Sequence, residues 1–225
     1  PNTRVGIHDI SFATGSLKLD LGVIAKRLEI DPQKYYTGIG QVEMSIPARD
    51  EDIVTLAADA ALPIIERHGA SRIRSVIVAT ETGIDQSKAA AVYVHHLLGL
   101  NANCRAVEFR QACSSATAAL QFAAAAVARD PSSQVLVIAT DVARYDRHSS
   151  GEATQGAGAV AMLVAADPAL ITLEPVTGLY TEDIMDFWRP NHRDTAYVDG
   201  KTSIRAYLNA VEHAWRDAQN QGAPS

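Results

Sequence analysis

Cysteine is scarce in this chain, and its scarcity argues against two classes of protein. Only two of the 225 residues are cysteine, Cys104 and Cys113. Two are too few for the disulfide framework of a small secreted domain, and no CxxC or Cys/His spacing indicates a metal site. We therefore expect neither a disulfide scaffold nor a bound metal. Cys104, placed before a predicted strand, is expected to pack rather than to react.

Long apolar runs and clusters of positive charge are also missing. No stretch of about eighteen apolar residues is present that could cross a membrane, and the first residues show no basic segment followed by an apolar one. The 20 lysine and arginine residues are outnumbered by 26 aspartate and glutamate residues, which gives a net charge of -6. Such a charge does not attract nucleic acid or an anionic membrane. We expect a cytoplasmic protein that binds neither.

What the chain does contain is a regular alternation of strand-like and helix-like segments. Its hydrophobic content of 47% is sufficient to bury a substantial core. Such alternation predicts an α/β fold with a sheet covered by helices on both faces. Strands are expected at residues 5–13, 75–80, 106–109, 134–139 and 156–165, and helices at 19–28, 52–68, 86–98, 114–129 and 203–219.

The most informative segment is FRQACSSAT at residues 109–117, which places Cys113 between a predicted strand and a predicted helix. At the first turn of a helix, unpaired N–H groups and the helix dipole favour an anion, so they are expected to lower the pKa of the thiol. This environment indicates a nucleophile. The alternative interpretation is a small buried hydrophobic residue.

Two carboxylates follow other predicted strands. Glu81 comes after the strand at 75–80, shortly before Gly83, and Asp141 comes after the strand at 134–139. Open α/β sheets gather their reacting groups at the carboxyl ends of the strands. Glu81 is therefore a candidate base, and a solvated loop acid is the alternative.

The predicted helix at 114–129 is rich in alanine. A helix with so few large apolar side chains is stable only if its backbone packs closely against neighbours on several sides. We therefore expect it to be a central helix of the fold.

Five separated motifs carry a resemblance to a known family. The segments ATETGID, FRQACSSAT, IATDVARY, GEATQGAGAVAML and YTEDIMDFWRP, in this order and spacing, resemble bacterial 3-hydroxy-3-methylglutaryl-CoA (HMG-CoA) synthase, a thiolase-like condensing enzyme. The resemblance extends from about Val5 to the end of the chain. It implies a layered thiolase-like fold in which the nucleophile's helix is buried between two related halves. Residues 1–166 would form the N-terminal half and residues 167–225 an insertion leading toward the second half.

The resemblance also implies a reaction and a set of site residues. Cys113 would carry an acetyl group from acetyl-CoA, and Glu81 would deprotonate that group so that it condenses with acetoacetyl-CoA to give HMG-CoA and CoA, as in the mevalonate pathway. No cofactor beyond these substrates is implied. The positions implied to bind substrate are Asp141, Tyr145, Thr154, Asp186, Ala112 and Ser114. For Tyr145 and Thr154, plain core and loop roles remain the alternative.

The chain departs from the family in two respects. The family's catalytic histidine belongs to a motif that would follow Ser225, and none of the seven histidines present stands in such a motif. We therefore expect that the chain is a fragment or that a complementary subunit completes it, in a homodimer or a mixed oligomer. Ser114 stands where the family usually has a tyrosine, which leaves the acyl specificity open.

Two further functions remain as alternatives. One is the related synthase of polyketide β-branching, which acts on β-ketoacyl groups held by a carrier protein. The other is a catalytically silent half that serves as an assembly subunit.

Overall fold

The structure, a computed structural model, describes residues 3–223 and divides into two compact units. The first unit comprises the chain up to Ala143 together with Ala153–Leu173. The second comprises Arg144–Glu152 and the chain from Glu174 onward. The boundary predicted at residue 166 stays a prediction, because a unit defined by contacts need not coincide with one half of a family fold.

The first unit is built on a mixed six-stranded sheet with the strand order β5-β4-β6-β7-β1-β8. Strands β4, β5 and β6 are parallel, whereas β7, β1 and β8 each run antiparallel to the preceding neighbour in that order. The strands are β1 (Val5–Thr14), β4 (Ile73–Ala79), β5 (Arg105–Phe109), β6 (Gln134–Ala143), β7 (Gly156–Ala166) and β8 (Ile171–Thr172).

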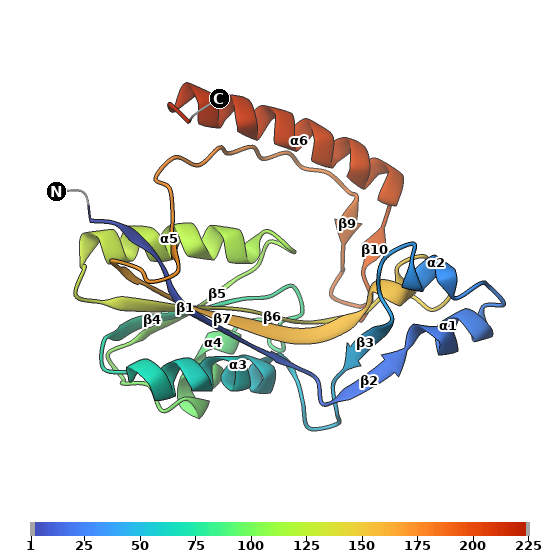
Figure 1. The fold of residues 1–225 in the computed structure, drawn as a ribbon, viewed down its shortest axis with the longest axis horizontal. Helices are drawn as coiled ribbons and strands as arrows, with labels where there is room; N and C mark the ends of the chain where they lie inside the picture. The colour runs from blue at the N-terminus through green and yellow to red at the C-terminus, as the bar shows by residue number, and fades with distance from the viewer. Residues whose placement is uncertain (1–2, 224–225) are drawn as a thin grey trace. The chain divides into compact units, whose positions relative to one another are not determined.

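Helices cover both faces of this sheet, as predicted. Helices α3 (Ile53–His68) and α4 (Ala90–Leu97) pack on one face, and α5 (Ser115–Arg129) packs on the other (Figure 1). Two separate apolar clusters result, one on each side of the central strands. The α/β fold class is therefore confirmed.

Helix α3 begins where the sequence places a strong start signal. The side chain of Asp52 accepts hydrogen bonds from the backbone N–H groups of Val54 and Thr55, and the Thr55 hydroxyl accepts one from the Asp52 N–H. This reciprocal pair satisfies backbone donors that a helix start otherwise leaves unpaired. The helix ends at His68, before Gly69 with φ +73°.

Helix α5 buries one face and exposes the other. Ala119, Ala123 and Val127 are fully buried against the sheet, whereas Phe122 is 63% exposed. The prediction of close packing by small side chains is confirmed for the sheet-facing side. Packing on further sides stays a prediction, because within the first unit only the sheet-facing side of α5 is buried.

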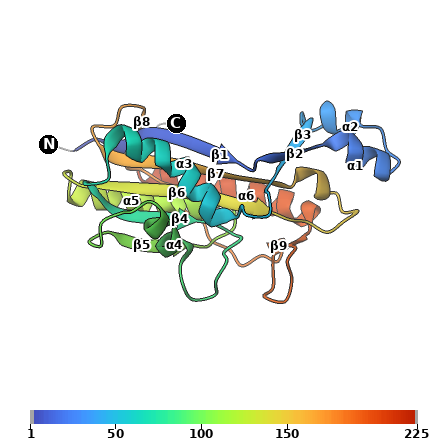
Figure 2. The same cartoon turned by 90° about the horizontal axis from the view of Figure 1, so that it is seen from below.

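A small extension lies at one end of the sheet (Figure 2). It contains β2 (Leu17–Asp20), α1 (Leu21–Arg27), α2 (Gln33–Tyr36) and β3 (Glu43–Ile46). The helix predicted from Leu19 instead begins at Leu21, because Leu17–Asp20 pairs with β3 and Asp20 caps α1 by accepting from Gly22 N–H. Strands β2 and β3 and helix α2 were not predicted.

Two further element bounds differ from the predictions. Helix α4 starts at Ala90 rather than at residue 86, because the Asp85 carboxylate accepts from the N–H groups of Ser87 and Lys88 and holds that segment as a turn. Strand β6 continues to Ala143, four residues beyond the predicted end, because its antiparallel partner β7 pairs with it over that length.

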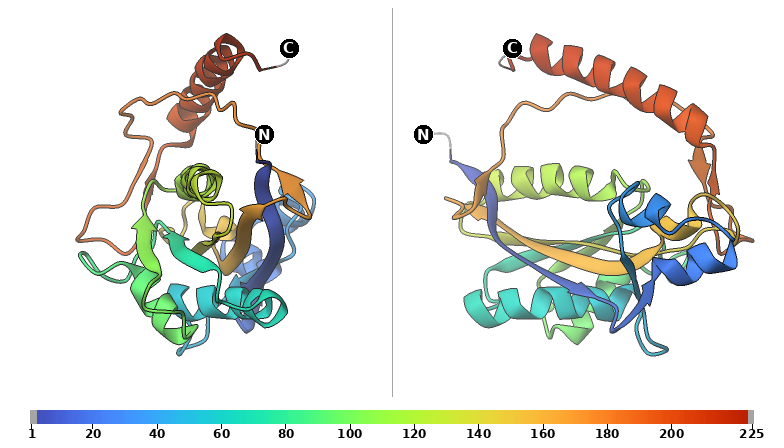
Figure 3. Two further views of the ribbon diagram at one scale, coloured as in Figure 1. Left: turned by 90° about the vertical axis from the view of Figure 1, so that its left-hand side faces the viewer. Right: turned by 45° about the vertical axis from the view of Figure 1, so that its right-hand side comes forward.

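The second unit contains two short strands, β9 (Phe187–Trp188) and β10 (Tyr197–Val198), and helix α6 (Gly200–Asn220), whose course is seen in Figure 3. The predicted helix at 203–219 is confirmed, with Asp199 as its cap. No residue of α6 is buried. Ile204, Tyr207 and Leu208 on its apolar side are each more than 60% exposed.

Candidate functional site

Cys113 lies in a tight turn between β5 and α5. Ser114 is the N-cap of α5 and the first helical residue is Ser115, so the cysteine precedes the helix rather than standing in its first turn as predicted. The turn is closed by backbone hydrogen bonds from Ser114 N–H to the Gln111 carbonyl and from Ser115 N–H to the Ala112 carbonyl. Ala112 has a φ of +42°, a conformation that residues other than glycine rarely adopt. Cys113 is exposed as a residue, although its sulfur is partly buried by the surrounding turn.

Glu81 lies on the loop that follows β4, and this loop is held by Asp141 of β6. Asp141 Oδ1 accepts four hydrogen bonds from the loop: from Thr80 Oγ1 at 2.9 Å, Glu81 N at 2.8 Å, Thr82 N at 3.1 Å and Thr82 Oγ1 at 2.8 Å. Hydrogen bonds to a carboxylate are among the stronger ones in proteins. Asp141 therefore fixes the backbone from which the half-buried Glu81 side chain projects.

The electrostatic surroundings of Cys113 connect it to both carboxylates. Partial burial raises the pKa of the Cys113 thiol, and the negative charges of Glu81 and Asp141 raise it further. The predicted lowering of this pKa by the helix start is therefore wrong for the chain as it stands, because burial and two neighbouring anions outweigh the backbone N–H contribution. Because the charges of Glu81 and Asp141 both act on the thiol, the three side chains lie near one another at one end of the sheet.

A second carboxylate, Glu108 of β5, supports the other side of the loop that carries Glu81. Glu108 accepts a hydrogen bond from Ala90 N–H at the start of α4 and from Arg110, the latter at 2.8 Å. Gly83 lies against this pair, since a Cβ placed on Gly83 would stand 2.5 Å from the Arg110 guanidinium and 2.9 Å from the Glu108 carboxylate. Only a glycine fits there without movement of its neighbours.

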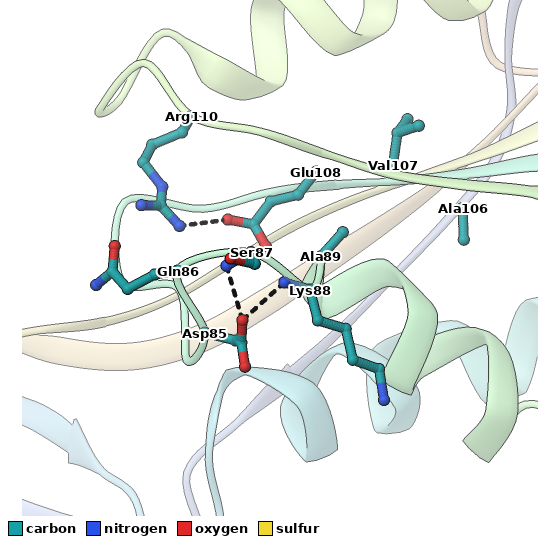
Figure 4. A pocket seen from close by; sticks show the side chains of 9 residues that line it. All are labelled: Asp85, Gln86, Ser87, Lys88, Ala89, Ala106, Val107, Glu108 and Arg110. Atoms are coloured by element: carbon teal, nitrogen blue, oxygen red, sulfur yellow. Dashed lines mark hydrogen bonds and ion pairs between the residues drawn. The ribbon is translucent and has the colours of Figure 1, made fainter.

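A surface pocket of about 370 Å³ adjoins this ion pair. Figure 4 shows Arg110 and Glu108 joined on one side and the Asp85 turn on the other. The two cations that line it, Lys88 and Arg110, are already engaged with the Tyr93 ring and with Glu108.

The other three predicted substrate-binding residues come from the segment before β7 and from the second unit. Thr154 is exposed in the first unit, at the end of a short 3-10 helix at Glu152–Thr154. Tyr145 and Asp186 belong to the second unit. Tyr145 is half-buried against Gly151, and Asp186 accepts a hydrogen bond from Ser203 of α6 at 2.8 Å. Their roles toward substrate stay predictions.

Ala112 and Ser114 flank the cysteine as the sequence requires. Ser114 is exposed and caps α5 without a side-chain hydrogen bond. The structure thus brings Cys113, Glu81, Asp141, Ala112 and Ser114 into one region of the first unit. Their roles in binding stay predictions as well.

Several residues that organise this region were not singled out from the sequence. Thr80 and Thr82 bind Asp141, Glu108 caps α4, and Ser115 bridges the cysteine turn. The threonines on both sides of Glu81 could have been noticed as donors for a carboxylate on the next strand. Ser115 carried no such signal.

The remaining candidate groups have structural roles. His95 binds the Asn101 carbonyl and His96 faces solvent. Cys104 packs against the core beneath α3 and α4. Among residues 3–223, no cluster of three or more potential metal ligands is found, and no helix has the length and apolar character needed to span a bilayer.

Comparison with known proteins places these features in one family. Residues 2–169 match the family described as hydroxymethylglutaryl-coenzyme A synthase N terminal. A hydroxymethylglutaryl-CoA synthase from Enterococcus faecalis is 44% identical over 211 residues, which cover 94% of this chain and 55% of that protein. A polyketide biosynthesis 3-hydroxy-3-methylglutaryl-ACP synthase, PksG from Bacillus subtilis, is 33% identical over 96% of this chain and 55% of its own length.

A solved structure supports the same relationship. The crystal structure of an HMG-CoA synthase complexed with CoA superposes with a TM-score of 0.94 at 43% identity, and the match covers 99% of this chain and 57% of the other. The chain therefore spans about half the length of the relatives that it matches.

Proposed function

The chain belongs to the hydroxymethylglutaryl-CoA synthase family, and from this membership we propose that it supplies the nucleophile and the base for the condensation of acetyl-CoA with acetoacetyl-CoA. The observation that carries the proposal is the convergence of Cys113, Glu81 and Asp141 at the carboxyl ends of β4 and β6, with Cys113 in the field of both carboxylates. The fold agrees with that of HMG-CoA synthase along almost the whole chain.

In the first step Cys113 takes up the acetyl group. The sulfur attacks the acetyl carbonyl carbon, the bond from that carbon to the CoA sulfur breaks, and CoA leaves as a thiol with the proton that the cysteine gave up. The backbone N–H of Cys113, which faces its own sulfur, is suited to hold the oxyanion that forms in between. An acetyl thioester on Cys113 remains.

In the second step Glu81 acts as the base. Its carboxylate removes a proton from the acetyl methyl group, and the resulting enolate carbon bonds to the ketone carbon of acetoacetyl-CoA, whose oxygen takes a proton. Water then hydrolyses the Cys113 thioester and releases HMG-CoA. The half-buried position of Glu81 and the rigid loop behind it suit a carboxylate that must abstract a proton from carbon.

The raised pKa of Cys113 indicates what the rest of the enzyme has to provide. Attack requires the thiolate, yet burial and two nearby anions favour the neutral thiol. A cationic or proton-accepting group from outside this chain would reverse that preference. The histidine that the family carries in its second half would be such a group.

Each unit has an apolar surface suited to a complementary half of the enzyme. In the first unit Phe122 of α5 and Phe12 of β1 are 63% and 74% exposed. In the second unit the apolar side of α6 is exposed. Large apolar side chains exposed together on one face are typical of protein interfaces. We propose that the partner is the C-terminal half of the same enzyme or a complementary subunit, within a homodimer or mixed oligomer in the predicted cytoplasmic location.

The test is acetylation of Cys113 by acetyl-CoA, followed by intact mass and peptide mapping. The purified chain is incubated with acetyl-CoA alone and together with the C-terminal part of its enzyme, and Cys113→Ala is the control. We expect an acetyl adduct on Cys113, with one equivalent of free CoA, when both parts are present, and formation of HMG-CoA with repeated turnover when acetoacetyl-CoA is added. No adduct in either case would contradict the proposal and favour an assembly subunit without chemistry of its own.

A second candidate function is favoured by the similarity to a 3-hydroxy-3-methylglutaryl-ACP synthase. In that case the acceptor β-ketoacyl group would be presented by an acyl-carrier protein rather than by CoA. Ser114, in place of the tyrosine usual after the nucleophile, would be compatible with a different acceptor. Turnover that begins only when a loaded carrier protein is added would distinguish this function from the first.

A further inference from the structure

Ser115 makes two hydrogen bonds that span the turn carrying Cys113. Its hydroxyl oxygen accepts from Gln111 N–H at 2.6 Å and donates to the Ala112 carbonyl at 2.8 Å. The residue is 2% exposed, so neither bond is readily replaced by water. The Ser115 side chain thus links the backbone of Gln111 to that of Ala112, the residue immediately before Cys113.

The turn needs this tie because Ala112 is held in an unfavourable conformation. Its φ of +42° brings the Cβ close to the backbone, and such a conformation persists only where the surroundings fix it. The Ser115 hydroxyl binds the carbonyl of Ala112 itself and the N–H of the preceding residue, Gln111, and so holds the backbone on both sides of the φ torsion of Ala112. Loss of the hydroxyl would let Ala112 relax toward negative φ, and Cys113 would move with it.

We propose that Ser115 is a positioning residue for Cys113: its hydroxyl keeps Ala112 at positive φ and thereby fixes the cysteine beside Glu81 and Asp141. This inference rests on the proposed function, in which Cys113 is the nucleophile. The hydroxyl does not touch the reacting atoms. It acts through the backbone of the turn.

The turn that follows α5 offers a matched control for Ser115. At the other end of the same helix, Ser133 makes a comparable bond, from its hydroxyl to the Asp130 carbonyl three residues earlier, at 2.8 Å. Ser133 is 6% exposed and lies beyond the far end of α5, which stops at Arg129. Ser133→Ala is therefore a matched control, because it removes a similar buried bond without touching the Cys113 turn.

The experiment measures the rate at which iodoacetamide alkylates Cys113 as a function of pH in the full chain. Peptide mass spectrometry separates Cys113 from Cys104, which serves as the internal reference for general loosening. The variants are Ser115→Ala, Ser133→Ala and the double variant Ala112→Gly with Ser115→Ala. Glycine adopts positive φ without strain, so it should restore the turn that the missing hydroxyl no longer holds.

For Ser115→Ala we expect the pH midpoint of Cys113 alkylation to fall by about half a pH unit, because the thiol moves away from the two carboxylates. This shift corresponds to about threefold more thiolate at a fixed pH. In the complete enzyme, acetylation by acetyl-CoA should slow by about tenfold, since the sulfur is displaced from its attacking position. Ser133→Ala should leave both values unchanged, and the double variant should return toward the parent.

Three results would overturn the inference. They are an unchanged Cys113 midpoint in Ser115→Ala, an equal shift in Ser133→Ala, or a parallel rise in Cys104 alkylation, which would indicate general loosening. The proposed function fails separately, if the parent enzyme forms no acetyl adduct on Cys113 while the midpoint shift in Ser115→Ala is still observed.

Discussion

Helices α3 and α6 are both long and amphipathic, yet they differ in what their apolar sides contact. Seven residues of α3 are buried, among them Leu56 and Ile64, whereas α6 has no buried residue although it is five residues longer, 21 against 16. The same contrast holds for the two units, because the three apolar clusters of the described chain all lie in the first. An amphipathic pattern therefore predicts a helix, but the partner of its apolar side decides how much stability it contributes.

The largest expected effect is a complete separation of the unfolding of the two units. Both tryptophans of the chain, Trp188 and Trp215, belong to the second unit. We expect tryptophan fluorescence to change at a lower urea concentration than far-ultraviolet circular dichroism, which follows mainly the helices and strands of the first unit, since a unit without an apolar core unfolds more easily. Coincident transitions would show that the two units stabilise each other.

Matched leucine substitutions test the contrast at the level of single side chains. Leu136 of β6 is fully buried, and Leu208 of α6 is 62% exposed. Leu136→Ala should lower the free energy of unfolding by about 3 kcal/mol, because it leaves a cavity in the core. Leu208→Ala should change it by less than about 0.5 kcal/mol in the isolated chain. Urea denaturation of both variants followed by circular dichroism gives the two values.

If the complementary half of the enzyme covers α6, Leu208 becomes buried on assembly and its substitution is no longer neutral. Leu208→Ala should then weaken association with that half, as measured by analytical ultracentrifugation. A variant that associates as tightly as the parent would place the interface elsewhere.

Removal of the Asp141 carboxylate tests whether the loop after β4 owes its order to hydrogen bonds. Asp141→Ala leaves the Thr80 hydroxyl, the Thr82 hydroxyl and the Glu81 N–H without their acceptor. We expect a loss of about 2 kcal/mol in the free energy of unfolding, since Thr80 is buried. Amide exchange at Glu81 and Thr82 should also accelerate. The exposed Asp50→Ala is the control, and equal exchange rates in both variants would contradict the role assigned to Asp141.

A smaller effect is expected at the junction of α3 and β1. Burial alone would raise the pKa of Asp9, but hydrogen bonds from Arg67 at 2.8 Å and His68 at 2.7 Å outweigh it and lower the pKa. A carboxyl with a lowered pKa in the folded state stabilises above its unfolded value, near pH 4, and loses that contribution as the pH falls through the folded pKa.

Asp9→Asn should therefore lower the free energy of unfolding by about 1 kcal/mol at neutral pH, a modest value because Arg67 is about half exposed. The difference from the parent should shrink as the pH falls below about 4. Asp59→Asn, at an exposed position of α3, the helix that carries Arg67, should show no such pH dependence. A difference that persists unchanged at low pH would mean that the charge of Asp9 is not its source.

The smallest expected effect concerns titration rather than stability. Because the charge of Glu81 raises the pKa of Cys113, Glu81→Gln should lower the pH midpoint of Cys113 alkylation, by about half a pH unit. The backbone bond from residue 81 to Asp141 is retained in this variant, so the loop should keep its position. A midpoint that rises or stays constant would show that Glu81 does not face the thiol.

The sequence predicted the sheet and its helices well where local signals and burial agree. Asp52 and Thr55 start α3 as their residue types indicate, and the apolar runs of β4 and β6 fall at the centre of the sheet. The short elements β2, β3 and α2 escaped prediction because β2 and β3 pair across more than twenty intervening residues, and such pairing leaves little local signal.

The candidate site was predicted in composition but not in its electrostatics. Cys113 was found because it lies between a predicted strand and a predicted helix, and Glu81 because it follows the buried strand β4; the structure brings both to one region. The direction of the Cys113 pKa was wrong, since a helix start is visible in the sequence whereas the distance to Asp141, which comes from another strand, is not. Ser115 was missed for a similar reason, as its role depends on the positive φ of Ala112.

The unequal lengths of two neighbouring strands have a consequence for how this protein tolerates change. Pairing of β6 with β4 stops at Ala139 opposite Ala79, while β6 continues along β7 to Ala143. The length of β6 beyond Ala139 sets the position of the Asp141 carboxylate beside the loop after β4. Inserting or deleting one residue at 139–141 would turn that carboxylate to the opposite face of the sheet, so natural and engineered length variation should be confined to the turns beyond residue 143.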